Sequence, residues 1–282
     1  MRLLWSAEAA PALQGLALAR EGGRLLAWDA RHGLFLFDSR GHRLVHRAPQ
    51  ADTVNACCSG DGASFATLSR SGLVRLLDQE LMPRWEQRFP QEGSALALDS
   101  FADRIAVADA AGGLHLLDGQ GKSVWQVTSP RPLRFVTFIP EVAALFGSAD
   151  FGLVLCCDAL GRCVWRDTPV THTGSIAASG DGSILAVARY SDGVCCYGLQ
   201  QNRPHVVRGT APSRLADVSY DGRFFLTAGL DDRLCLRDAT GGELAVQTLP
   251  ARLAALALAP AGDRAALALA NGTILVYATR VS

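Results

Sequence analysis

The sequence predicts an all-β protein, because apolar segments, glycine turns and prolines recur at a regular interval along the chain. A glycine, once replaced by arginine, begins an apolar segment every 39 to 41 residues, at Gly33, Gly72, Gly113, Gly152, Gly193, Arg233 and Gly272. A proline follows the last apolar segment of each unit, at Pro11, Pro49, Pro90, Pro130, Pro169, Pro212 and Pro250. These seven anchors predict seven structural units.

Each unit is expected to contain four short strands. The first is small and apolar, as in residues 96–98 and 256–259, and turns such as Gly60-Asp61-Gly62 favour a hairpin into a more hydrophobic second strand. The third runs from the anchoring glycine to an aspartate, as in residues 113–118, and the fourth passes through a tryptophan such as Trp125. Repeated four-stranded units of this length predict a seven-bladed β-propeller of antiparallel blades.

The two ends of the chain are expected to meet in the last blade. The seventh unit stops soon after its third strand, at residues 273–277, and so lacks a fourth. Residues 2–7, followed by Pro11, have the pattern of an unpaired fourth strand. We therefore expect residues 2–7 to complete the last blade, because closing the ring removes open sheet edges. Residues 1–282 are then expected to form a single propeller domain.

Charge and hydropathy limit the partners of the chain. The 27 basic and 27 acidic residues balance, which argues against nucleic-acid binding through general phosphate attraction. No stretch approaches the roughly 18 apolar residues of a membrane span. The apolar run at residues 3–5 is too short for a signal peptide, which also disfavours a periplasmic assembly factor. We expect no nucleic-acid partner and no membrane insertion.

The eight cysteines are interpreted as reduced, buried thiols. Six form adjacent pairs inside apolar strands, where neighbouring side chains point to opposite faces, at Cys57/Cys58, Cys156/Cys157 and Cys195/Cys196. No CxxC spacing is present, so we expect no metal site and no cofactor. Reduced thiols favour a cytoplasmic location. Only one basic residue, Lys122, is lysine, which we interpret as a GC-rich, bacterial coding bias.

The pattern D-x-x-G-x-x-x-W at residues 118–125 and 158–165 resembles the repeat of pyrroloquinoline-quinone-type propellers. The four-strand organisation with Gly-Asp-Gly turns resembles the WD-repeat superfamily in its looser bacterial forms. The resemblance covers all 282 residues, and its motifs specify a fold. It implies scaffolds, assembly factors and enzymes alike, so function must be argued from individual sites.

Residues for catalysis are scarce. No GxSxG, HExxH or P-loop pattern occurs, and the six histidines have no metal-ligand spacing. The expected first strands supply two carboxylates, Asp99 and Asp217. An enzyme or small-ligand sensor that uses the propeller channel is therefore the alternative function, and a cavity containing both carboxylates with a bound metal would favour it.

Arginines gather on one expected face of the ring. Turns between second and third strands share a face with the connections between blades, and loops on a rigid scaffold often carry recognition. We name seven residues on this face the arginine arc: Arg131, Arg134, Arg189, Arg208, Arg214, Arg233 and Arg252. The planar guanidinium pairs well with carboxylates. The sequence thus predicts a non-catalytic protein–protein interaction scaffold or adaptor, a subunit of a bacterial multiprotein complex, whose arginine arc docks an acidic segment of a partner.

Overall fold

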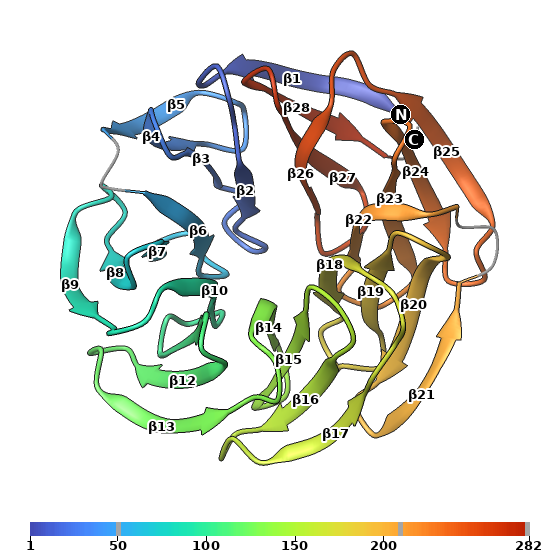
Figure 1. Ribbon diagram of the computed structural model, residues 1–282. Helices are drawn as coiled ribbons and strands as arrows, with labels where there is room; N and C mark the ends of the chain where they lie inside the picture. Colours follow the sequence, from blue (N-terminus) through green and yellow to red (C-terminus); the bar gives the residue numbers. More distant parts are fainter. Residues whose placement is uncertain (49–51, 208–210, 280–282) are drawn as a thin grey trace.

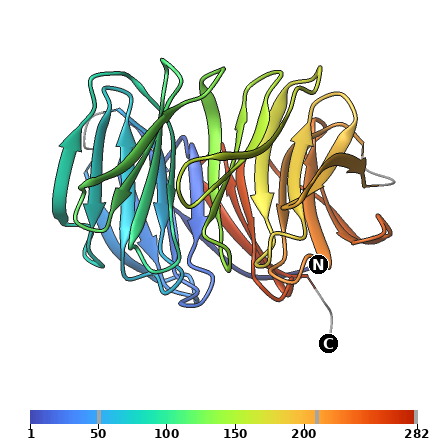
Figure 2. The same ribbon diagram turned by 90° about the horizontal axis from the view of Figure 1, so that it is seen from below.

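The strands form a ring of seven antiparallel sheets with four strands each (Figure 1). This computed structural model describes residues 1–48, 52–207 and 211–279, and no helix occurs within these ranges. The strands run between the two faces of a disc (Figure 2). The predicted seven-bladed β-propeller is therefore confirmed.

Every blade is built in chain order from the channel outwards, except the last. The first three blades are β2 (Gly15–Leu18), β3 (Leu25–Asp29), β4 (Gly33–Phe37) and β5 (Arg43–Arg47); β6 (Thr53–Cys58), β7 (Phe65–Ser69), β8 (Leu73–Leu77) and β9 (Pro83–Arg88); β10 (Gly93–Leu98), β11 (Arg104–Asp109), β12 (Gly113–Asp118) and β13 (Ser123–Thr128). Blades 4 to 6 are β14 (Leu133–Ile139), β15 (Ala144–Ala149), β16 (Val154–Asp158) and β17 (Cys163–Asp167); β18 (Thr173–Ala178), β19 (Leu185–Arg189), β20 (Gly193–Gly198) and β21 (Gln201–Val206); β22 (Ser213–Val218), β23 (Phe224–Gly229), β24 (Arg233–Asp238) and β25 (Glu243–Thr248). Blade 7 contains β26 (Leu253–Leu258), β27 (Arg264–Leu269), β28 (Thr273–Ala278) and β1 (Arg2–Glu8).

The N-terminal strand closes the ring. Figure 1 shows β1, in blue, beside β28, in red. The pairing is antiparallel, with Trp5 opposite Val276 and Ala7 opposite Ile274. The expectation that residues 2–7 complete the last blade is confirmed.

Tryptophans fasten the outer strand of one blade to the next blade. The indole N–H groups donate to backbone carbonyl oxygens 34 residues further on, at 2.8 to 3.1 Å, in the pairs Trp5–Ser39, Trp85–Gly119, Trp125–Ala159 and Trp165–Leu199. The Trp125 ring lies against Gly161, where φ is +77° and an added Cβ would lie 2.9 Å from the ring. The glycine and the tryptophan of the repeat therefore belong to one contact between blades.

The repeated aspartates hold the turn between third and fourth strands. The Oδ1 atom of each accepts backbone N–H groups two and four residues later, at 2.8 to 2.9 Å, in Asp38, Asp78, Asp118, Asp158 and Asp238. The N–H of Arg162 is the main cause that holds the pKa of Asp158 below its ordinary value. These aspartates act as turn formers.

The core lies between blades. Between blades 4 and 5, for example, Phe146, Val187 and Tyr197 are buried in one apolar cluster. The Tyr197 hydroxyl donates to Asp167 at 2.8 Å, so its polar atom has a partner. All eight cysteines are free thiols, and within the described ranges no helix has the length and apolarity to cross a bilayer.

Candidate functional site

The two faces of the disc carry different connections. Because strands alternate in direction, the turns between second and third strands share one face with the connections between blades. We call this the mouth face. The turns between first and second strands and between third and fourth strands form the opposite face, which we call the closed face.

A β-bulge marks the first strand of most blades near the mouth face. In β14 the register shifts between Leu133 and Phe135, which leaves Arg134 as the additional residue. The same irregularity in six blades singles out Val54, Ser94, Arg134, Gly174, Arg214 and Ala254. A bulge re-aims the side chain of the additional residue. These positions therefore set which side chains surround the end of the channel.

Four arginines line a cavity of about 430 Å³ at this end of the channel: Arg70, Arg134, Arg214 and Arg252. We call them the arginine mouth. The other lining residues are Leu13, Gln14, Val54, Leu253, Ala254 and Ala270, so none of the described lining residues is an aspartate or a glutamate. The described lining therefore consists of four positive charges, one side-chain amide and apolar groups, without an acidic side chain.

Two arginines of the mouth come from bulges and two from loops. Arg134 and Arg214 are the bulged residues of β14 and β22. Arg70 lies between β7 and β8; its N–H donates to the Asp52 carbonyl oxygen at 2.9 Å, and its own carbonyl oxygen accepts from Gly93. The carbonyl oxygen of Arg252, before β26, accepts from the Ala270 N–H at 2.7 Å. Backbone hydrogen bonds thus hold both loop arginines at the channel.

The arginines of the mouth differ in whether their guanidinium groups have hydrogen-bond or ion-pair partners within the described chain. Arg214 donates from Nη2 to the Leu253 carbonyl oxygen and lies 3.7 Å from the Asp232 carboxylate. Burial, and then the charge of Arg252, lower the pKa of Arg214. The side chains of Arg70, Arg134 and Arg252 make no hydrogen bond or ion pair with any described residue. Guanidinium groups gathered without counter-charges attract an anion.

The structure divides the predicted arginine arc. Arg134, Arg214 and Arg252 come together in the mouth. Arg131 lies outside that lining, exposed in the connection between β13 and β14. Arg189 pairs with Asp192.

Arg233 lines a separate cavity of about 70 Å³ that also contains Asp231 and Glu243. Arg208 lies outside the described residues. Among the described members of the arc, three therefore line the mouth and three, Arg131, Arg189 and Arg233, do not.

Sequence reasoning missed Arg70. Its signal was available, because Arg70 precedes the anchoring Gly72 in a turn between a second and a third strand. That turn belongs to the mouth face by the same topological rule that selected the arc. The predicted arc contains no residue before Arg131 and therefore does not include Arg70.

The other end of the channel is occupied by side chains. Arg20 follows β2 in blade 1, and its Nη2 lies 3.5 Å from the Ala178 carbonyl oxygen of blade 5, so it spans the channel. Asp217 of blade 6 accepts the Leu258 N–H at 2.7 Å. Burial raises the pKa of Asp217, and the charge of Arg20 counteracts part of that shift. These contacts join non-adjacent and adjacent blades at the closed face.

The two carboxylates of the first strands lie apart. Asp217 is on the channel wall, whereas Asp99 lines a groove of about 170 Å³ between blades 3 and 4. The groove that contains Asp99 does not contain Asp217. Nor do three or more potential metal ligands cluster among the residues described. Asp99 and Asp217 thus lie in different surroundings and do not form the pair that would favour catalysis in the channel.

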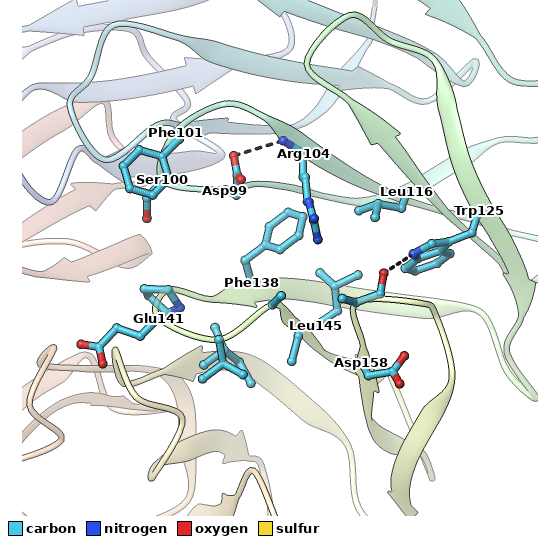
Figure 3. A pocket seen from close by; sticks show the side chains of 16 residues that line it. Asp99, Ser100, Phe101, Arg104, Leu116, Trp125, Phe138, Glu141, Leu145 and Asp158 are labelled. Atoms are coloured by element: carbon cyan, nitrogen blue, oxygen red, sulfur yellow. Dashed lines mark hydrogen bonds between the residues drawn. The ribbon is translucent and has the colours of Figure 1, made fainter.

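The groove between blades 3 and 4 is mainly apolar (Figure 3). Phe101, 77% exposed, stands at its rim, and Phe138 lies within it. Two of its carboxylates have partners inside the chain: Asp99 accepts the backbone N–H of Arg104, and Asp158 pairs with Arg162. The arginine mouth gathers three guanidiniums without a partner among the described residues around one cavity, and is therefore the stronger candidate site.

Comparison with known proteins adds one similarity. No protein-family profile matches the chain. Telomerase protein component 1 of Rattus norvegicus is 24% identical over 273 residues, which are 93% of this chain. The chain spans only 8% of the length of that relative. The match therefore extends over nearly the whole ring of blades and leaves most of the relative uncovered.

Proposed function

We propose that this protein is a non-catalytic protein–protein interaction scaffold whose partner docks an acidic segment in the arginine mouth. One observation carries the proposal. Four arginines surround a cavity of about 430 Å³ without a lining carboxylate, although acidic and basic residues are equal in number over the whole chain. The local excess of positive charge marks this face as the place for an acidic partner.

The chemistry of arginine supports a protein ligand. A guanidinium offers a fork of N–H donors that matches a carboxylate with two parallel hydrogen bonds. Arg70, Arg134 and Arg252 have these donors unpaired within the described chain. The propeller holds them on loops and bulges of a rigid ring, which reduces the ordering cost of binding.

The role inside an assembly is in keeping with the similarity to a protein that is named as a component of telomerase. The proposal further includes a bacterial complex, suggested by the single lysine among 27 basic residues, and a cytoplasmic location, suggested by eight free thiols. We also propose that residues 1–282 act as a single domain, since β1 joins the two ends of the chain in blade 7.

Binding of a fluorescent oligoglutamate peptide, followed by anisotropy at low salt, tests the proposal. The double variant Arg134→Glu/Arg252→Glu reverses two unpaired charges of the mouth and should weaken binding by about tenfold or more. The matched control, Arg131→Glu/Arg233→Glu, makes the same change in net charge outside the mouth and should retain most of the affinity.

Two results would contradict the proposal. One is equal weakening by both double variants, which would indicate only a general effect of net charge. The other is no detectable binding of oligoglutamate by the unmodified protein. Circular dichroism verifies that each variant keeps its β structure.

A further inference from the structure

We infer that the arginine mouth receives the acidic C-terminal end of a partner chain. This inference rests on the proposed function and deepens it, because it specifies which part of an acidic protein enters the site. Three features carry it. The cavity is small, Arg20 reaches across the channel near the closed face, and several guanidinium N–H donors of the mouth have no partner among the described residues.

The size of the cavity favours a short ligand. Sites that enclose small ligands have volumes of about 300 to 1,000 Å³, and the mouth, at about 430 Å³, lies in the lower part of that range. An extended segment that crosses the face would leave most of its length outside. A chain end can place its last residues within the cavity.

A side chain reaches across the channel near the closed face. The cavity near the closed face, of about 200 Å³, has no described lining residue in common with the mouth. Arg20 lines that second cavity and spans the channel to the Ala178 carbonyl oxygen. Tyr220, whose pKa is raised by burial and by the nearby Glu141 carboxylate, also lies at the closed face. Arg20 thus narrows the far end of the channel, which favours a chain that ends in the mouth or turns back.

A terminus satisfies more donors in less space than a turning segment. The last residue of an acidic tail carries its α-carboxylate in addition to a side-chain carboxylate. Arg134 projects from β14 of blade 4 and Arg252 precedes β26 of blade 7, so the two unpaired guanidiniums come from different sides of the ring. Each can form two parallel bonds to one carboxylate. The apolar lining, including Val54 and Leu253, can contact the methylene groups of the terminal residues.

The remaining arginines complete the arrangement. Arg214 is held by the Leu253 carbonyl oxygen and by Asp232, and its side chain is 14% exposed, so it forms part of the fixed wall. Arg70 adds a third unpaired guanidinium from blade 2. The site therefore matches a terminal α-carboxylate accompanied by one or two acidic side chains.

Three labelled peptides of the same length and the same number of glutamates test the inference against the full chain. The first ends in glutamates with a free carboxylate, the second is its C-terminal amide, and the third has the glutamates in its middle followed by a neutral tail. The first should bind most tightly, with about tenfold weaker binding of the amide. Arg134→Gln/Arg252→Gln should remove the difference between the first two peptides, whereas Arg131→Gln/Arg233→Gln should preserve it.

The possible results separate the inference from the proposed function. Equal affinity for all three peptides would overturn the C-terminal inference and leave an acidic-segment scaffold standing. No binding of any peptide would overturn both. Tighter binding of the free acid that persists in the Arg134→Gln/Arg252→Gln variant would overturn the assignment of the terminus to the mouth.

Discussion

Arginine occurs at both ends of the propeller channel, but in different circumstances. At the closed face, Arg20 spans the channel to the Ala178 carbonyl oxygen, and its charge acts on Asp217. At the mouth face, Arg134 and Arg252 point into a cavity and have no partner among the described residues. The difference is that one nitrogen of the Arg20 guanidinium has an acceptor within the chain, whereas the guanidiniums of Arg134 and Arg252 have none among the described residues.

The backbone explains why the two ends differ. At the closed face, turns of neighbouring blades hydrogen-bond to one another: Gly60 to Ser100 at 2.8 Å and Gly180 to Tyr220 at 2.7 Å. At the mouth face the first strands are bulged, and bulges direct side chains into the channel. Backbone bonds between neighbouring blades also occur at the mouth face, as from Gly93 to Arg70, so the bulges and the side chains that they direct distinguish this end.

The largest expected effect on stability is at the closed face. Asp217→Ala removes the acceptor of the Leu258 N–H and the negative charge near Arg20. We expect the free energy of unfolding to fall by about 2 kcal/mol, as measured by urea denaturation, because a bond to a charged group is lost and a donor is left unpaired. Arg134→Ala at the mouth should stay within about 0.5 kcal/mol of the wild type. Similar losses in both variants would remove the distinction between the two ends.

The pH dependence sharpens this test. Burial raises the pKa of Asp217 above its unfolded value of 3.8. The stability that such a group contributes is fully present below the unfolded pKa and is lost as the pH rises through the folded pKa. The wild type should therefore gain stability relative to Asp217→Asn as the pH is lowered from neutral towards 3.8. A constant difference over this range would contradict the burial of the carboxylate.

A smaller effect is expected at the outer rim of the closed face. Trp125→Phe keeps a ring on Gly161 but loses the N–H donor to the Ala159 carbonyl oxygen. Thermal or urea unfolding should show a loss of about 1 kcal/mol, the usual net value of one hydrogen bond. Trp85→Phe removes the equivalent bond to Gly119 and should behave alike. No loss in either variant would show that ring packing alone joins the blades.

The smallest effect is expected at the mouth, and it has the opposite sign. Arg252 lies close enough to Arg214 to lower its pKa, so the two like charges repel. Arg252→Ala should leave the free energy of unfolding unchanged or raise it by up to about 0.5 kcal/mol at low salt, and added salt should abolish the gain. A loss of about 1 kcal/mol or more would instead indicate a structural partner for Arg252.

Part of the site could be predicted from the repeat. The alternation of strand directions assigns each turn to a face, and this rule placed Arg134, Arg214 and Arg252 on the face where they line one cavity. It could not separate Arg189 from them, because Arg189 lies on the same face but turns to Asp192. Position along the axis of the ring follows from the repeat; distance from the channel depends on side-chain direction and local partners.

The amino-acid sequence by itself determined the number of blades, the four strands of each and the closure by the N-terminal strand. These features depend on local patterns, namely alternating apolar residues, turn chemistry and a regular spacing. The patterns recur along the chain, so each repeat supports the same assignment. The tertiary structure decided that Arg70 joins the mouth, that Arg20 spans the channel, and that Asp99 and Asp217 lie apart. Each of these relations concerns residues of different blades. Their positions relative to one another are defined only when the blades close into a ring.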